Sequence, residues 1–115
     1  MSDCIFCRIV SRELPANELG RTADAVAFRD LDPKAPVHVL VVPVKHVSAV
    51  RDATGTDGEA LLGRVFAFAA ELATELGLDA DGYRLVTNTG QHGGQSVDHL
   101  HVHVLGGRAL GWPPG

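Results

Sequence analysis

The chain is 115 residues long and has the composition of a single globular domain, with 45% hydrophobic and 21% charged residues. These values exclude intrinsic disorder as the main description of the chain. Apolar runs such as 39–44 are far shorter than the ~20 residues of a transmembrane helix, and we expect no secretory signal in residues 1–14. We therefore expect a cytoplasmic protein without a membrane partner.

The charge pattern argues against nucleic acid as a partner. Ten basic and fourteen acidic residues give a net charge of −4, and no two Lys or Arg residues are adjacent. A basic patch that faces phosphates is therefore not expected. A small phosphorylated molecule remains compatible with this charge, because backbone amides and histidines can hold a phosphate locally.

In the first half of the chain, strands are expected over 24–30 and 37–42. The second strand is almost wholly apolar, which predicts that both of its faces are covered. A long helix should begin at a capping box formed by Thr56 and Glu59 and end at Gly77. Its apolar stripe is wide enough to face both the sheet and a second subunit.

The second half predicts a strand over 83–88, a glycine-rich loop over 89–96 and a final strand over 98–105. The tail, 106–115, cannot form regular structure but contains the only tryptophan, Trp112. Because burial of an indole ring stabilises a protein, we expect this tail to dock onto another surface.

The final strand carries the most distinctive pattern in the sequence. His99, His101 and His103 are two residues apart, so alternation places them on one face of a strand and the apolar residues between them on the other. His38 lies within the apolar strand in the first half of the chain. Four imidazoles converge if these two strands are neighbours in the sheet.

Such a cluster supports two kinds of chemistry. Histidines can hold a zinc ion with an open position for water, as in metal-dependent hydrolases. Alternatively, a neutral imidazole held in one tautomer can act as a nucleophile. The loop Gly93-Gly94-Gln95-Ser96 runs directly into the histidine strand. Its amides and hydroxyl form a candidate phosphate cradle, which favours phosphoryl or nucleotidyl transfer.

Cys4 and Cys7 form a C-x-x-C motif near the start of the chain. In a cytosolic protein this spacing indicates metal or redox chemistry before a structural disulfide. Two reduced, partly buried cysteines are the alternative interpretation.

The segment His99-Leu-His-Val-His-Val-Leu105 resembles the His-φ-His-φ-His-φ-φ motif (φ, apolar) of the histidine triad nucleotide-binding (HIT) family, specifically its Hint branch. The loop 93–96 and the Trp-Pro-Pro-Gly end, 112–115, also have counterparts there. The resemblance implies one α+β domain over 1–115, with a five-stranded antiparallel sheet, one long helix and a short N-terminal helix. It also implies a homodimer with a ten-stranded sheet, near whose active sites the tail 106–115 docks.

The same resemblance implies a hydrolase of purine nucleoside 5′-phosphoramidates and aminoacyl adenylates that needs no catalytic metal. His101 would be the nucleophile that forms a nucleotidyl-histidine. His99 would fix its tautomer, His38 and His103 would orient it and relay a proton, and Ser96 would help to protonate the leaving amine. The purine nucleotide would contact Asp30 at the ribose; Asn88, Gly94, Gln95 and Ser96 at the phosphate; and Ile5, Phe6, Ile9, Leu14, Phe28 and Leu31 at the base. Trp112 would reach towards the site of the other subunit.

Bacterial relatives in this family also suggest a structural zinc ion, here held by Cys4, Cys7, His46 and His99, since two thiolates and two imidazoles suit tetrahedral zinc. Three other functions stay open at this point. They are dinucleoside polyphosphate hydrolysis within the same family, a nucleotide-binding regulatory module, and a zinc hydrolase that uses the histidine row. A zinc hydrolase predicts that a chelator abolishes turnover, whereas a nucleophilic histidine predicts turnover without free metal.

Overall fold

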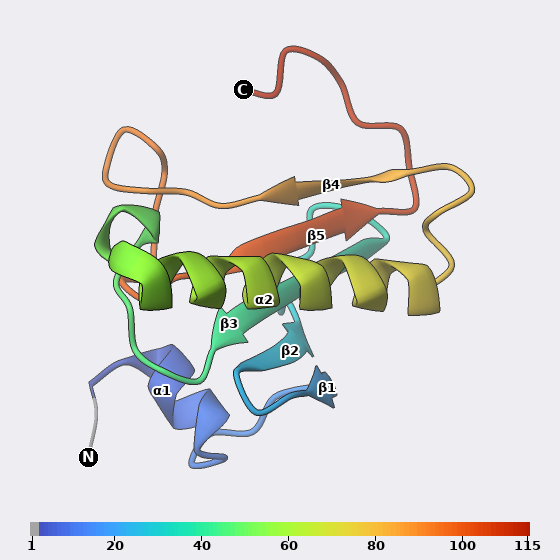
Figure 1. Ribbon diagram of the computed structural model, residues 1–115. Coiled ribbons are helices and arrows are strands. Elements are labelled where there is room, and N and C mark those ends of the chain that lie inside the picture. Colours follow the sequence, from blue (N-terminus) through green and yellow to red (C-terminus); the bar gives the residue numbers. More distant parts are fainter. Residues whose placement is uncertain (1–2) are drawn as a thin grey trace.

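The computed structural model of the protein describes residues 3–115, in which a five-stranded sheet has a helix on each face (Figure 1). The expected α+β class, antiparallel sheet, long helix and short N-terminal helix are confirmed. In chain order, the elements are α1 (Ile5–Val10), β1 (Glu18–Arg21), β2 (Ala25–Arg29), β3 (Val37–Pro43), the 3-10 turn η1 (Val50–Asp52), α2 (Gly55–Glu75), β4 (Tyr83–Val86) and β5 (Val102–Gly106).

The strand order across the sheet is β1-β2-β3-β5-β4, and each neighbouring pair is antiparallel. The central position of β3 explains its nearly unbroken apolar sequence, because both faces of this strand are covered. β5 pairs directly with β3, with Leu40 opposite His103. The two strands are therefore neighbours in the sheet, as the convergence of His38 with the other histidines requires.

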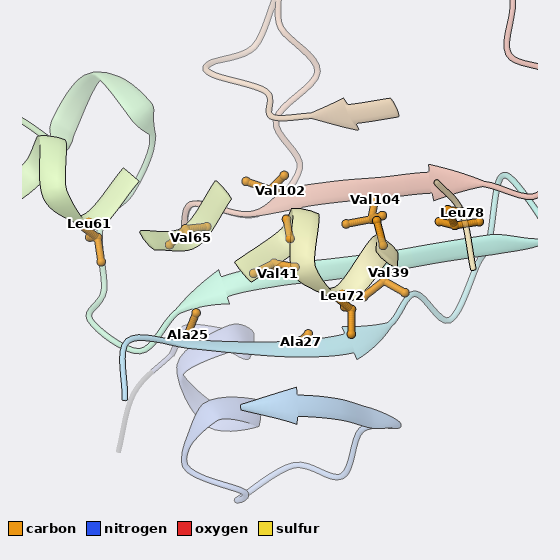
Figure 2. Packing of buried hydrophobic residues seen from close by; sticks show 12 residues of the cluster. Ala25, Ala27, Val39, Val41, Leu61, Val65, Leu72, Leu78, Val102 and Val104 are labelled. Atoms are coloured by element: carbon orange, nitrogen blue, oxygen red, sulfur yellow. The ribbon is translucent and has the colours of Figure 1, made fainter. Parts of the chain in front are cut away.

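The face of the sheet beneath α2 is packed with hydrophobic side chains (Figure 2). α2 packs against β2, β3 and β5. Its buried residues, among them Val65 and Leu72, form one cluster with Val39, Val41 and Val104. Burial of a side chain of this kind contributes roughly 1.5–3 kcal/mol, so this face supplies most of the apolar burial that stabilises the domain.

The opposite face of the same strands mixes apolar and ionisable side chains. Phe6 of α1 packs there with Val26, Phe28 and Leu40. The rings of Phe6 and Phe28 meet edge to face, with their centroids 5.6 Å apart. His38 lies on this face because alternate residues of β3 point away from α2. The short helix and the histidines therefore share one side of the sheet.

The start of α2 differs from the prediction. The helix begins at Gly55, with Thr54 as its N-cap, and no side chain caps it. The expected capping box of Thr56 and Glu59 is therefore wrong, since both residues lie inside the helix. A backbone hydrogen bond from the Gly58 N–H to the Thr54 carbonyl, 3.2 Å long, closes the first turn instead.

The end of the long helix agrees with the prediction, and the last strand does not. Gly77, with a φ of +78°, follows the helix as expected. β5 begins only at Val102, because the residues before it bond elsewhere. The Leu100 N–H donates to the Val47 carbonyl at 2.7 Å, and the His99 ring turns towards the cysteines.

The C-terminal tail passes β4, the edge strand of the sheet (Figure 1). The Arg84 guanidinium holds it by donating to the Gly111 carbonyl at 2.6 Å. Trp112 is 83% exposed, so it does not dock onto the described part of the chain. No helix in the described part of the chain is long and apolar enough to cross a membrane.

Candidate active site

Two of the three clustered histidines line a pocket of about 240 Å³ beside α1. The lining combines His101 and His103 with Ser96 and an apolar wall that includes Phe6 and Phe28. A larger hollow of about 610 Å³ lies at the start of α2, but its lining contains neither histidine nor cysteine. The smaller pocket is the candidate active site, because it combines nucleophilic side chains with an apolar binding surface.

His101 is buried, and its ring is held in one orientation. Its Nδ1–H donates to the His99 carbonyl at 2.7 Å, since a carbonyl oxygen can only accept. A neutral His101 ring therefore has no proton on Nε2, and this lone pair is available for nucleophilic attack. Phe6 packs edge-on against the ring, with the centroids 5.1 Å apart. The hydrogen bond is the one that the family resemblance implies.

A chain of hydrogen bonds fixes the tautomers of the other two histidines. The backbone N–H of Lys34 donates to His38 Nδ1 at 3.0 Å, so a neutral His38 carries its proton on Nε2. That Nε2 lies 2.9 Å from His103 Nδ1 and 3.4 Å from a carboxylate oxygen of Asp30. His103 Nδ1 is therefore the acceptor, and a neutral His103 carries its proton on Nε2.

Burial keeps these imidazoles neutral. It lowers the pKa of His38, and the Asp30 carboxylate opposes this shift. Burial, together with the neighbouring His101 and His38 rings, lowers the pKa of His103 to about 4. At neutral pH, His103 is therefore a neutral donor that can offer its Nε2–H to a phosphoryl oxygen.

Gln95 braces the glycine-rich loop. Its side-chain amide donates to the carbonyls of Ser48, at 2.6 Å, and of Val97, at 3.0 Å, while its side-chain oxygen accepts from the Gly90 N–H at 3.0 Å. These bonds use the amide group to hold the loop, and Gln95 does not line the pocket. Ser96, the next residue, lines the pocket and is exposed.

Asn88 and Gly94 also shape the loop without lining the pocket. The Asn88 side chain donates to the Gly93 carbonyl at 2.7 Å. Gly94 has a φ of +80°, a conformation that glycine adopts without strain. The structure therefore places both residues in the loop, with Ser96 as the member of this set that meets the pocket.

The apolar wall contains most of the residues expected at the base. Leu14 is outside it and lies on a neighbouring hollow with Arg12 and Glu18. The chain turns sharply before Leu14, where Arg12 has a φ of 64°. Sequence reasoning did not assign Leu40 to the wall, although it is two residues from His38 on the same strand face. The expected residues that do line the pocket are Ile5, Phe6, Ile9, Phe28, Asp30 and Leu31, and those not anticipated include Pro15, Ala16 and Val97.

A second cluster lies beside the pocket and contains the expected metal ligands. One donor atom from each of Cys4, Cys7, His46 and His99 falls within 4.8 Å of every other. His99 Nδ1 is 3.2 Å from Cys4 Sγ, 3.5 Å from Cys7 Sγ and 3.1 Å from His46 Nδ1. The His99 ring is completely buried at this point. These four residues are positioned to bind a metal ion.

The chemistry of the donor set fits zinc. The Nε2–H of His99 donates to the Pro43 carbonyl at 2.9 Å, so the neutral ring has a free lone pair on Nδ1, as a metal ligand requires. Burial lowers the pKa of His99 and keeps it in this neutral form. Zinc bond lengths place tetrahedral ligand atoms about 3.3–3.8 Å apart, close to the distances between these donor atoms.

Thr87 is a further residue of the site that sequence reasoning did not identify. Its hydroxyl donates to the His101 carbonyl at 2.9 Å. β4 ends at Val86 and β5 begins at Val102, so this side-chain bond continues the pairing of the two strands by one position. The only signal in the sequence is a hydroxyl residue at the end of a predicted strand, which is too common to be diagnostic.

Fold and site together define a class of protein: an α+β domain in which a histidine donates its Nδ1–H to a backbone carbonyl and lies beside an apolar pocket and a glycine-rich loop. Known proteins of this class show strong similarity to the chain. Residues 11–110 match the HIT domain family. An uncharacterised HIT-like protein of Synechococcus elongatus is 47% identical over 113 residues, which cover 98% of this chain and 97% of that protein.

Solved structures give the same result. A HIT family hydrolase from Legionella pneumophila matches with a TM-score of 0.94 and 43% identity, covering 98% of this chain and 100% of that one. A histidine triad nucleotide-binding protein from Candida albicans matches with a TM-score of 0.82 and 31% identity, covering 96% and 83%. The chain belongs to the HIT family, and its relatives include proteins described as hydrolases and as nucleotide-binding proteins.

Proposed function

We propose that this protein hydrolyses nucleoside 5′-phosphoramidates and aminoacyl adenylates, preferring purine nucleosides, through a nucleotidyl-histidine intermediate on His101. The observation that carries the proposal is the hydrogen bond from His101 Nδ1–H to the His99 carbonyl. It leaves the Nε2 lone pair available in a histidine that lines an apolar pocket, as a nucleophilic imidazole requires. The substrate class follows from the resemblance to the Hint branch.

In the first step, His101 Nε2 attacks the α-phosphorus. A bond forms between phosphorus and nitrogen, and the bond to the leaving group breaks. A departing amine needs a proton, because its anion is a poor leaving group. We assign the delivery of this proton to the Ser96 hydroxyl. The Nε2–H of His103 donates to a phosphoryl oxygen and offsets its charge.

In the second step, water attacks the phosphorus of the nucleotidyl-histidine. The bond between phosphorus and His101 breaks, the nucleoside monophosphate leaves, and the Nε2 lone pair is restored. The proton lost by the water returns to the Ser96 oxygen, which gave up its own proton in the first step. His103 and His38 do not carry this proton, because the hydrogen bond between them runs from His38 Nε2–H to His103 Nδ1 and leaves His103 protonated on Nε2. Splitting one displacement into two easier steps is the advantage of a covalent intermediate.

The remaining residues bind or position the nucleotide. Asp30 accepts from the Asp32 N–H at 2.8 Å, which supports a fixed orientation of its carboxylate towards the ribose hydroxyls. Asn88, Gly94 and Gln95 act at the phosphate by holding the shape of the loop. The apolar wall around Phe6 receives the base.

We further propose that Cys4, Cys7, His46 and His99 hold a structural zinc ion. Two thiolates and two imidazoles complete a tetrahedral zinc site and leave no position open for substrate. Bound zinc would link the start of α1 to the segment before β5. The proposed reaction at His101 uses no catalytic metal.

The proposed assembly is a homodimer with a ten-stranded sheet, formed through α2 and β4. The position of β4 at the edge of the sheet and the exposed ring of Trp112 support it. In this assembly Trp112 reaches the site of the other subunit. We place the protein in the cytoplasm, where thiols such as those of Cys4 and Cys7 stay reduced.

The test is turnover of adenosine 5′-phosphoramidate by the wild type and by His101→Ala. Both are assayed with and without brief exposure to EDTA, which scavenges free metal, and zinc content and circular dichroism are measured on the same samples. We expect the wild type to stay active in EDTA and the folded His101→Ala variant to lose at least about 10⁴-fold in kcat.

Other results would favour the other functions. Activity retained by His101→Ala would exclude the nucleophile proposed here. Loss of wild-type turnover in EDTA with zinc still bound to the cysteine cluster would favour a zinc hydrolase. Binding of adenosine nucleotide without turnover by either protein would favour a regulatory module, and faster turnover of a dinucleoside polyphosphate would favour that branch of the family.

A further inference from the structure

The cysteine pair is directly connected to the nucleophile through His99. The His99 ring lies within 3.2 Å of Cys4 Sγ and 3.5 Å of Cys7 Sγ. The His99 carbonyl accepts the Nδ1–H of His101 at 2.7 Å. The ring of His99 thus belongs to the cluster with the two cysteines, and its backbone carbonyl fixes the tautomer of His101.

A second connection runs through α1. Phe6 lies inside the C-x-x-C motif, and its ring contacts both His99, at 5.9 Å between centroids, and His101, at 5.1 Å. The same helix contributes Ile5 and Ile9 to the pocket. α1 has six residues, too few for a helix to be stable without tertiary contacts. Zinc bound by Cys4, Cys7, His46 and His99 would therefore anchor this wall of the pocket, in addition to the packing of Phe6.

We propose that the Cys4–Cys7 pair is an oxidation site that switches the enzyme off. A peroxide converts the two metal-binding thiolates into a disulfide, the zinc ion leaves, and His101 loses support from both His99 and α1. This proposal depends on the proposed zinc site, which supplies the ion that is released. It also depends on the proposed function, which supplies the turnover that is lost.

The oxidation balances with hydrogen peroxide as the oxidant. One thiolate attacks a peroxide oxygen, the O–O bond breaks, and a sulfenic acid and a hydroxide ion form. The second thiolate attacks the sulfenic sulfur, an S–S bond forms, and a second hydroxide leaves. The two sulfurs lose two electrons, the peroxide gains them, and two solvent protons convert the hydroxides to water. Zinc retains two imidazole ligands and dissociates.

The geometry of the motif suits this reaction. Two residues three apart at the start of a helix have Cα atoms about 5 Å apart, within the range for a disulfide. The Cys7 N–H donates to Cys4 Sγ at 3.4 Å. Both cysteines are partly exposed, and the neighbouring His46 is exposed, so a small peroxide can reach the sulfurs. The sequence contains no other cysteine and only one methionine, Met1, so the oxidation products are few.

The experiment treats the zinc-loaded wild type with hydrogen peroxide and follows five quantities. These are free thiols, intact mass, zinc released to a colorimetric chelator, and the affinity for AMP alongside turnover. We expect loss of both thiols, loss of the mass of two hydrogens and release of one zinc ion per chain. kcat/KM should fall by roughly 10-fold or more, as when support behind a reactive group is removed. Dithiothreitol with zinc should restore it.

Two controls separate the switch from general damage. Cys7→Asp keeps a ligand that zinc accepts but cannot form the disulfide. Cys4 can still form a sulfenic acid, so the mass should rise by one oxygen instead of falling by two hydrogens, and zinc content and turnover should change less with peroxide than in the wild type. Removing zinc from the reduced wild type by prolonged dialysis against a chelator should lower kcat/KM as oxidation does. Circular dichroism should show that α2 and the sheet persist, because none of the four cluster residues belongs to the core beneath α2.

The proposal is overturned if the disulfide forms and zinc leaves while kcat/KM stays unchanged. It is also overturned if peroxide inactivates Cys7→Asp as strongly as the wild type, or if the thiols oxidise without forming a disulfide. If the untreated wild type shows no phosphoramidate turnover, the proposed function has failed by itself. The switch is then judged by AMP affinity, and an affinity unchanged by zinc release would overturn it.

Discussion

The two faces of the sheet are made from alternate residues of the same strands, yet they carry different kinds of side chain. On β5, Val102 and Val104 join the apolar cluster beneath α2, whereas His103 lines the pocket beside α1. On β3, Val39 belongs to the same cluster, whereas His38 is buried on the pocket side. A face covered by one long helix holds the domain together, and a face covered by one short helix leaves room for a substrate.

Because of this difference, some residues of a strand contribute to stability and their neighbours contribute to the chemistry of the site. A buried apolar side chain beneath α2 contributes through its packing, which tolerates no polar group. A buried histidine beside α1 is compatible with folding because each ring nitrogen that is buried has a partner. Neighbouring residues of β5 should therefore respond to mutation in opposite ways.

The largest effect on stability is expected beneath α2. Leu72→Ala removes a side chain that is 2% exposed and leaves a cavity in the core. The free energy of unfolding should fall by about 3 kcal/mol, measured by urea denaturation. Turnover of the folded variant at low temperature should stay within about two-fold of the wild type, since Leu72 belongs to the cluster beneath α2 and does not line the pocket. A folded variant with much lower turnover would show that the two faces are coupled.

The next effect should fall on the pocket side. His103→Asn keeps an acceptor for the Nε2–H of His38 but removes the Nε2–H donor to the phosphoryl oxygen. kcat should fall by roughly 10²-fold, in a steady-state assay with adenosine 5′-phosphoramidate. The free energy of unfolding should change by less than about 1 kcal/mol. Val104→Ala is the matched control on the same strand and should show the reverse pattern.

The histidine face should also make stability depend on pH. The pKa of His38 is lowered in the folded chain, and that of His103 is lowered to about 4, so the unfolded chain takes up protons first as the pH falls. The free energy of unfolding should be highest above pH 6.5 and decrease towards pH 4. The titratable groups that face His103 are His101, His38 and Asp30.

Urea denaturation at several pH values tests this prediction. His103→Asn should reduce the slope of unfolding free energy against pH, because one of the shifted groups is gone. Equal slopes for the two proteins would show that His103 is not neutral in the folded state at these pH values.

The smallest effect is expected at Thr87. Thr87→Val keeps the shape of the side chain but removes the hydrogen bond to the His101 carbonyl. We expect about 1 kcal/mol less stability and a decrease of a few-fold in kcat, since the strand pairing next to the nucleophile loosens. Thr87→Ser restores the hydroxyl and should recover both quantities. Failure of Thr87→Ser to do so would point to packing of the methyl group rather than to the hydrogen bond.

Several features of the fold lie beyond what local patterns can predict. β1 has only four residues, and its ends are exposed, so it lacks the apolar alternation that marks a strand. The capping box at Thr56 and Glu59 satisfied the sequence rule, but a backbone bond between Thr54 and Gly58 starts the helix earlier. Leu14 matched the family pattern and was assigned to the base wall, yet the turn at residue 12 places it on a neighbouring hollow.

The sequence by itself determined the position of the long helix and the row of alternating histidines that ends in β5, because side-chain direction in helices and strands repeats with a fixed period. The α+β class and the set of candidate metal ligands came from the resemblance of the histidine motif and its neighbouring segments to the HIT family. Only the tertiary structure decided which nitrogen of each histidine carries the proton. It also showed that His99 serves two clusters and that Thr87 and the Lys34 amide hold the site. Their partners lie far apart in the chain or on the backbone, so hydrogen bonds that set reactivity depend on packing rather than on local pattern.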